Sequence, residues 1–95
     1  MAKPKILISD NLDQDGVDIL NASGLFEVDF RKKTSREELE AVIPEVEGLI
    51  IRSASKVDKA LVEKAAKLKV VIRAGVGVDN IDIPVCSQKG IVVMN

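Results

Sequence analysis

Five short strand-like runs, separated by polar or helix-like stretches, limit what this 95-residue chain can fold into. Four of the runs are rich in Val, Ile and Leu, and residues 25–30 alternate apolar and acidic side chains; both patterns are typical of strands. Strands that alternate with helices form a parallel sheet through right-handed crossovers, with helices on both of its faces. The runs are residues 5–9, 25–30, 48–51, 70–74 and 91–94.

Helix signals lie between the runs. Ser35 and Glu38 are spaced as a capping box, and Pro44 is expected to end or kink the helix that they open. Gly24 and Gly90 are suited to end helices because glycine adopts positive φ easily. The predicted helices cover residues 17–23, 36–43, 58–67 and 81–89.

The second run indicates the strand order. Phe26, Val28 and Phe30 alternate with Glu27 and Asp29, which is typical of a half-exposed edge strand. The order 2-1-3-4-5 puts this strand at an edge, and it is the flavodoxin-like doubly wound α/β arrangement. In such sheets ligands bind beyond the carboxyl ends of the strands.

Composition excludes several classes of function. The chain has 14 basic and 15 acidic residues, and this balance argues against nucleic-acid and membrane-surface binding. It has no His, the commonest general base and metal ligand. Cys86 is the only cysteine and is expected to be a small buried residue. No apolar run is long enough to span a membrane, so a soluble, cytoplasmic domain is expected.

The middle of the chain is basic. Residues 51–73 hold seven basic and two acidic side chains, and Arg52 and Arg73 fall at the carboxyl ends of two predicted strands. If these strands are neighbours, both guanidinium groups lie at one edge, where they could bind carboxylate or phosphate. Ser53 and Ser55 could add hydroxyl donors. The alternative is that the two arginines pair with loop acids such as Asp79.

A glycine-rich segment follows Arg73. Gly75 and Gly77, on either side of Val76, allow the backbone to approach an anion and to present successive amides to it. The segment fails as a dinucleotide fingerprint because Asn80 stands where the third glycine belongs. Asp79 and Asn80 are expected to shape a turn through bonds to their own backbone.

The loop after the first run argues against two rival classes. A flavodoxin needs a hydroxyl-rich phosphate loop there, whereas Asp10 and Asp13 are acidic. A phospho-acceptor receiver domain also needs an Asp after the third strand, where this chain has Arg52. The spacing of Asp13, Asp15 and Asp18 does not fit a calcium loop.

Four segments together resemble the amino-terminal part of the D-isomer-specific 2-hydroxyacid dehydrogenases, within them the branch acting on 3-phosphoglycerate. The resemblance covers essentially the whole chain, and the last three segments are its specific part. The segments are Ile6–Asp10, Gly48–Val57, Arg73–Asp82 and Lys89–Asn95.

The resemblance implies roles for the residues found above. The amides around Gly75, Val76 and Gly77 would hold the substrate carboxylate, and Asn80 would shape that loop. Arg52, Ser53 and Arg73 would face the phosphate of 3-phosphoglycerate.

The resemblance also implies a division of labour. Residues 1–95 would form a single truncated substrate-binding domain. A Rossmann domain that binds NAD and supplies the catalytic residues, and a helix that returns to the substrate-binding domain, would lie outside this chain. The chain alone is therefore expected to bind no cofactor, to be inactive and to self-associate through uncovered surface. The alternatives are a stand-alone or engineered flavodoxin-like module, or the same lobe of another D-2-hydroxyacid dehydrogenase.

Overall fold

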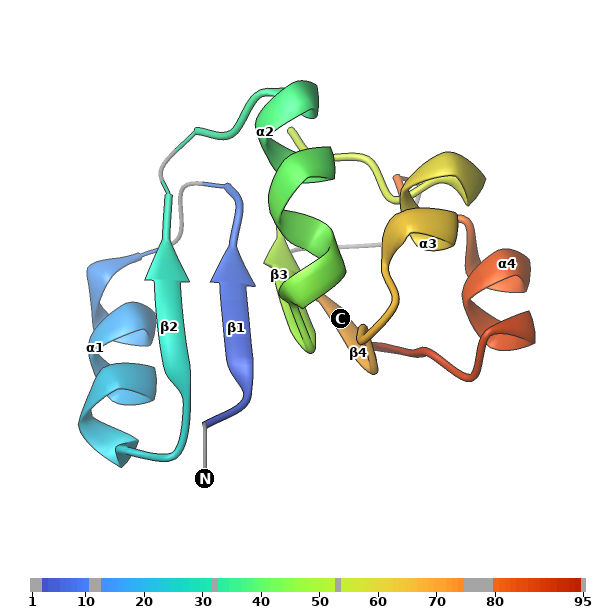
Figure 1. Cartoon of the computed structure of the whole chain (residues 1–95). Coiled ribbons are helices and arrows are strands. Elements are labelled where there is room, and N and C mark those ends of the chain that lie inside the picture. The colour runs from blue at the N-terminus through green and yellow to red at the C-terminus, as the bar shows by residue number, and fades with distance from the viewer. Residues whose placement is uncertain (1–2, 11–12, 32, 53, 75–79, 95) are drawn as a thin grey trace.

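The chain folds into a five-stranded parallel sheet in the order β2-β1-β3-β4-β5, as the sequence predicted (Figure 1). The computed structural model describes residues 3–10, 13–31, 33–52, 54–74 and 80–94. The predicted flavodoxin-like order is confirmed, with the acidic strand β2 at one edge. The strands are β1 (Lys5–Ile8), β2 (Glu27–Phe30), β3 (Gly48–Ile51), β4 (Val70–Arg73) and β5 (Val92–Met94).

The register of the sheet places its side chains in rows across the strands. Leu7 is level with Leu49, Leu49 with Val71, and Val71 with Val93. Leu7, Leu49 and Val71 are fully buried and belong to the main core, which also contains residues from α2, α3 and α4. Because side chains alternate along a strand, the neighbouring row of isoleucines lies on the opposite face of the sheet.

The helix ends are set largely by the predicted local signals. In α2 (Arg36–Val42) the Glu38 amide donates to Ser35 Oγ at 3.1 Å, and the Ser35 amide donates to Glu38 Oε1 at 3.2 Å. Pro44 lies in a 3₁₀ turn, η1 (Ile43–Glu45), that follows this helix. Gly24 has φ +68° at the end of α1 (Gln14–Ser23). Gly90 has φ +75° after α4 (Ile83–Gln88).

Helix α3 (Lys59–Lys64) is shorter than the predicted 58–67. Asp58 is its N-cap and accepts from the Leu61 amide at 3.0 Å, but Ala65, with ψ +75°, already leaves the helical conformation. The early end lets both Ala65 and Leu68 reach the core. It also brings the Lys69 amide to the Glu47 carbonyl at 2.8 Å, where β4 begins beside β3.

The remaining sequence predictions concern burial and membrane spans. Cys86 is fully buried in the core, and this burial, aided by Asp82, raises the pKa of its thiol. Across the described ranges, no helix has the length and apolar character needed to cross a membrane.

Replacing Leu49 by Ala is expected to destabilise the fold by about 3 kcal/mol, because it opens a cavity in the middle of the sheet. Leu49 has no exposed surface and lies in an interior strand. Urea unfolding measures the loss. Ile19→Ala is the control, since Ile19 is 71% exposed on α1 and should change the free energy of unfolding little. A loss no larger than that of the control would contradict this account of the core.

Candidate functional site

Arg52 and Arg73 lie at the same edge of the sheet. Arg73 is the last residue of β4 and is level with Ile51, the last residue of β3, so Arg52 begins the adjacent loop. The Ala74 amide continues this pairing and donates to the Ile51 carbonyl at 2.8 Å. The expectation that these two strands are neighbours is therefore confirmed.

The loop after β3 is held by a buried carboxylate that sequence reasoning missed. Asp10, only 4% exposed, follows β1, which lies beside β3. Its Oδ2 accepts from the Arg52 amide at 2.6 Å and from the Ser55 amide at 3.0 Å, and its Oδ1 accepts from Ser55 Oγ at 2.6 Å. The signal was available in the predicted strand order, because Asp10 follows β1 just as Arg52 follows β3.

Ser55 does not provide the hydroxyl donor that the sequence suggested for a ligand. Its side chain is buried and its Oγ is bonded to Asp10 Oδ1 at 2.6 Å and to Ser9 Oγ at 2.8 Å. The hydroxyl hydrogen is thus used within the protein. An anion would have to be bound by other groups of this loop.

The Asn80 side chain bonds to the loop after β3, whereas the sequence predicted bonds to its own backbone. Its Nδ2 donates to the Arg52 carbonyl at 2.7 Å and to the Ser55 carbonyl at 2.5 Å. Both acceptors lie in the loop after β3, more than 20 residues earlier in the chain. The side chain therefore joins two loops that the sequence treats as separate.

The backbone joins the same two loops. The Val57 amide donates to the Asn80 carbonyl at 2.8 Å, and the Asp82 amide donates to the Val57 carbonyl at 2.8 Å. These two bonds make a short parallel bridge between Val57 and Ile81, both of which are buried. The segment that enters α4 is thereby fixed to the segment that enters α3.

Several of the predicted site residues lie outside the described residues. They are Ser53, Gly75, Val76 and Gly77, together with Asp79, the predicted partner of the arginines. The structure therefore brings together Arg52, Arg73 and Asn80 at one edge and adds Asp10 to them.

A hollow of about 390 Å³ is lined by residues 54–56 of the loop after β3 and by Thr34, Arg36, Leu39 and Asp58. The Arg36 guanidinium group at this hollow donates to Glu40 at 2.7 Å, to Asp58 at 2.6 Å and to the Lys56 carbonyl at 3.1 Å. The bonds to Glu40 and Asp58 raise the pKa of Arg36. Arg36 thus already has two carboxylate partners in this hollow.

Within the described ranges, no cluster of three or more His, Cys, Asp or Glu side chains could hold a metal ion. Guanidinium groups at a sheet edge can bind carboxylate or phosphate without transferring a proton, because Arg stays protonated.

The chain is similar to D-3-phosphoglycerate dehydrogenases from distant organisms. It is 43% identical to that of Synechocystis over 91 residues, which are 96% of this chain and 16% of the relative. It is 50% identical to that of Homo sapiens over 91 residues, 96% of this chain and 17% of the relative. The chain thus spans about one sixth of the length of these curated relatives.

Solved structures share the fold. The NAD⁺-bound 3-phosphoglycerate dehydrogenase of Entamoeba histolytica matches with a TM-score of 0.84 and 33% identity, over 99% of this chain and 33% of that chain. The PH0520 protein of Pyrococcus horikoshii matches with a TM-score of 0.89 and 28% identity, over 98% of this chain and 28% of that chain.

The family comparison covers nearly the whole chain. The model of the D-isomer specific 2-hydroxyacid dehydrogenase catalytic domain matches residues 6–95, which include every strand except the first residue of β1. The order of the strands agrees with this match. The chain belongs to the D-isomer specific 2-hydroxyacid dehydrogenase family.

Proposed function

We propose that this chain is part of the substrate-binding domain of an NAD-dependent, cytoplasmic dehydrogenase that oxidises 3-phosphoglycerate to its 2-keto acid. The observation that carries the proposal is that Arg52 and Arg73 stand at the carboxyl ends of adjacent parallel strands. The relatives named D-3-phosphoglycerate dehydrogenase support the substrate, which carries a carboxylate and a phosphate.

The proposed roles divide the substrate between two loops. Arg52, Ser53 and Arg73 bind the phosphate, and the amides of Gly75, Val76 and Gly77 bind the carboxylate. Asn80 takes part through its bonds to the Arg52 and Ser55 carbonyls, which hold the two loops together. The Arg52 amide is bonded to Asp10, so Arg52 would act through its side chain.

We assign the cofactor and the proton transfer to other parts of a longer protein. Oxidation at C2 releases a hydride, which NAD⁺ accepts, and a hydroxyl proton, which a general base removes. This chain has no His and lacks a complete dinucleotide fingerprint. Residues 1–95 would therefore bind and orient the substrate, while a separate domain binds NAD.

The chain alone is expected to produce no NADH from NAD⁺ and 3-phosphoglycerate, because it lacks a His base and a dinucleotide site. The measurement is NADH absorbance, with a complete D-3-phosphoglycerate dehydrogenase as the positive control. A rise in absorbance that scales with the concentration of this chain would contradict the proposed division of labour.

Binding of 3-phosphoglycerate is expected at roughly millimolar affinity, because one loop edge without a closing second domain buries little of the ligand. Amide chemical shifts should change at residues 52–55 and 73–80. Arg52→Gln should weaken binding roughly ten-fold, since a charge-assisted hydrogen bond is lost. Lys67→Gln is the control and should leave binding unchanged. Lys67 lines a polar hollow with Lys3 and Lys5 near the amino end of β1, which is the end of the sheet opposite the proposed site.

D-lactate, which has no phosphate, tests which substrate the site prefers. It should bind more weakly than 3-phosphoglycerate and should not respond to Arg52→Gln. Equal affinities would favour another D-2-hydroxyacid as the substrate, and shifts clustered elsewhere in the protein would refute the site.

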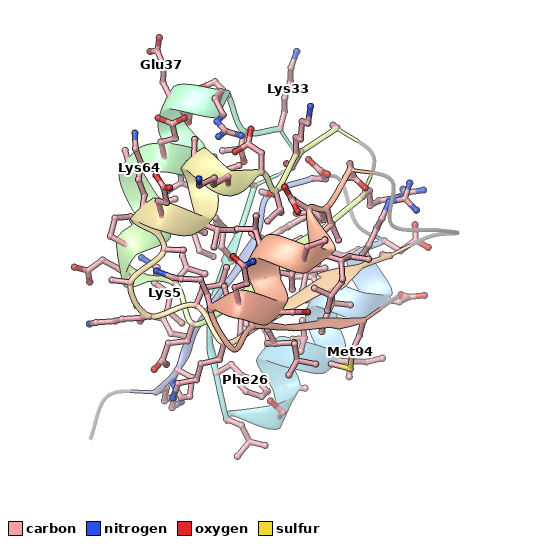
Figure 2. All side chains as sticks on the ribbon, turned by 90° about the vertical axis from the view of Figure 1, so that its right-hand side faces the viewer. Lys5, Phe26, Lys33, Glu37, Lys64 and Met94 are labelled. Carbon is pink, nitrogen blue, oxygen red and sulfur yellow. The ribbon has the colours of Figure 1, made fainter. Side chains whose placement is uncertain are left out.

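One face of the sheet provides the surface for the proposed self-association. A row of side chains lies on the face opposite the main core and consists of Ile8, Ile50, Ile72 and Met94. Val92 lies two residues before Met94 in β5 and therefore on the same face. Burial falls across this face from Ile8, which is 1% exposed, to Met94 and Val92, which are 48% and 56% exposed. In Figure 2 Met94 projects on the side of the sheet where α1 lies, opposite Lys64 of α3.

We propose a second copy of this chain as the occupant of that face. Within the described part of the chain, α1 is the helix on this side, and it packs against β2 at the far edge. Residues 91–94 are uncharged, whereas β2 at the other edge carries Glu27 and Asp29. An uncharged edge strand beside an exposed apolar face favours association of like chains.

The chain is expected to form dimers at high concentration, measured by sedimentation equilibrium. Val92→Lys should shift the population to monomers, because it places a charge in the proposed interface. Ile19→Lys introduces the same charge on an exposed position of α1 and should leave the dimer intact. A chain that stays monomeric up to millimolar concentration would refute the proposed interface.

A further inference from the structure

A negative charge lies directly beneath a loop that is proposed to bind an anion. The Asp10 carboxylate is almost completely buried and accepts three hydrogen bonds from the loop after β3. By charge alone this carboxylate would repel a phosphate at Arg52. Its contribution to the site must therefore come from geometry and not from attraction.

Asp10 and Asn80 together hold both ends of that loop. At Arg52 the amide donates to Asp10 at 2.6 Å, and the carbonyl accepts from Asn80 at 2.7 Å. At Ser55 the amide donates to Asp10 at 3.0 Å, and the carbonyl accepts from Asn80 at 2.5 Å. Four backbone groups of two residues are thus bound by two side chains, one from each neighbouring loop.

The surrounding contacts fix Asp10 and Asn80 in turn. The Ser9 and Ser55 hydroxyls lie 2.8 Å apart beside the Asp10 carboxylate, and all three residues are buried. The Asn80 carbonyl accepts from the Val57 amide at 2.8 Å, so the backbone of Asn80 cannot shift independently of the start of α3. Asp10 and Asn80, with the backbone groups that they bind, are therefore connected to β1, to the loop after β3 and to the segment before α4.

We propose that Asp10 is a positioning residue of the anion site, acting with Asn80 to hold the backbone of Arg52 and Ser55 so that Arg52 is presented to the ligand. This inference rests on the proposed function. A loop ordered before the ligand arrives loses less conformational freedom on binding, so the affinity is higher. Three donors bond to the carboxylate and partly compensate its charge, which reduces the repulsion of the ligand.

Asp10→Asn provides the test. Asn has one acceptor oxygen in place of two. Its NH₂ group would face N–H or O–H donors that bond to the carboxylate in the unmodified protein. In the absence of ligand, amide exchange at Arg52 and Ser55 should accelerate at least roughly ten-fold relative to Val71 in the core. The affinity for 3-phosphoglycerate, measured by chemical shifts under conditions where the variant is folded, should fall several-fold.

Two control variants separate positioning from stability. Asp15→Asn makes the same chemical change at an exposed position of α1 and should alter neither readout. Leu68→Ala lowers the stability of the core near the start of β4, at the end of the sheet opposite Arg73, and should leave the affinity unchanged while the protein is folded. An equal loss of affinity in Leu68→Ala would overturn the positioning role.

If Asp10→Asn does not fold, Asn80→Ala decides the question, because it releases the two carbonyls and leaves Asp10 in place. Normal exchange and normal affinity in the folded variant would overturn the inference. If the unmodified chain does not bind 3-phosphoglycerate, the proposed function fails. The exchange rates, measured without ligand, then decide separately whether Asp10 orders the loop.

Discussion

The parallel register of β1, β3 and β4 is the constraint on which the rest of the structure depends. It aligns Leu7, Leu49 and Val71 in one buried row, and this row forms the centre of the main core. Because the three strands run in the same direction, the same register brings their carboxyl ends to one edge. Asp10, Arg52 and Arg73 therefore come to the same edge because the packing of the apolar row fixes the register of the strands.

The edge combines charges of both signs in different roles. The Asp10 carboxylate is buried and bonded to backbone and hydroxyl donors, so its charge serves the conformation of the loop. Arg52 is exposed at the same edge, where a guanidinium group can bind an external anion. Neither the net charge of −1 nor the excess of basic residues in the middle of the chain reveals this division.

Much of the fold could be predicted because its causes are local. The alternation of charge in residues 27–30 indicated the edge strand, the Ser35–Glu38 spacing indicated a helix start, and Gly24 and Gly90 ended helices with positive φ. The prediction for residues 58–67 was wrong at its end. Helix propensity favours continuing past Lys64, but burial of Leu68 and pairing of Lys69 with Glu47 need the chain to turn earlier.

The candidate site was predicted less completely than the fold. The place of Arg52 and Arg73 at one edge followed from the strand order, since each residue lies at the end of one of two adjacent strands. The roles of Ser55 and Asn80 were wrong in part, because each side chain was assigned to a ligand or to its own turn. Their actual partners are Asp10 and the Arg52 carbonyl, which lie 45 and 28 residues away in sequence.

The sequence by itself determined the alternation of strands and helices, the order of the strands and the family resemblance, because periodicity, capping and motifs are properties of neighbouring residues. Only the tertiary structure decided which polar groups at the edge are available to a ligand and which hold the protein together. That choice depends on hydrogen bonds between loops that the sheet brings within 3 Å of one another. A hydroxyl or an amide has the same chemistry in either role, and only its position in the fold distinguishes the two.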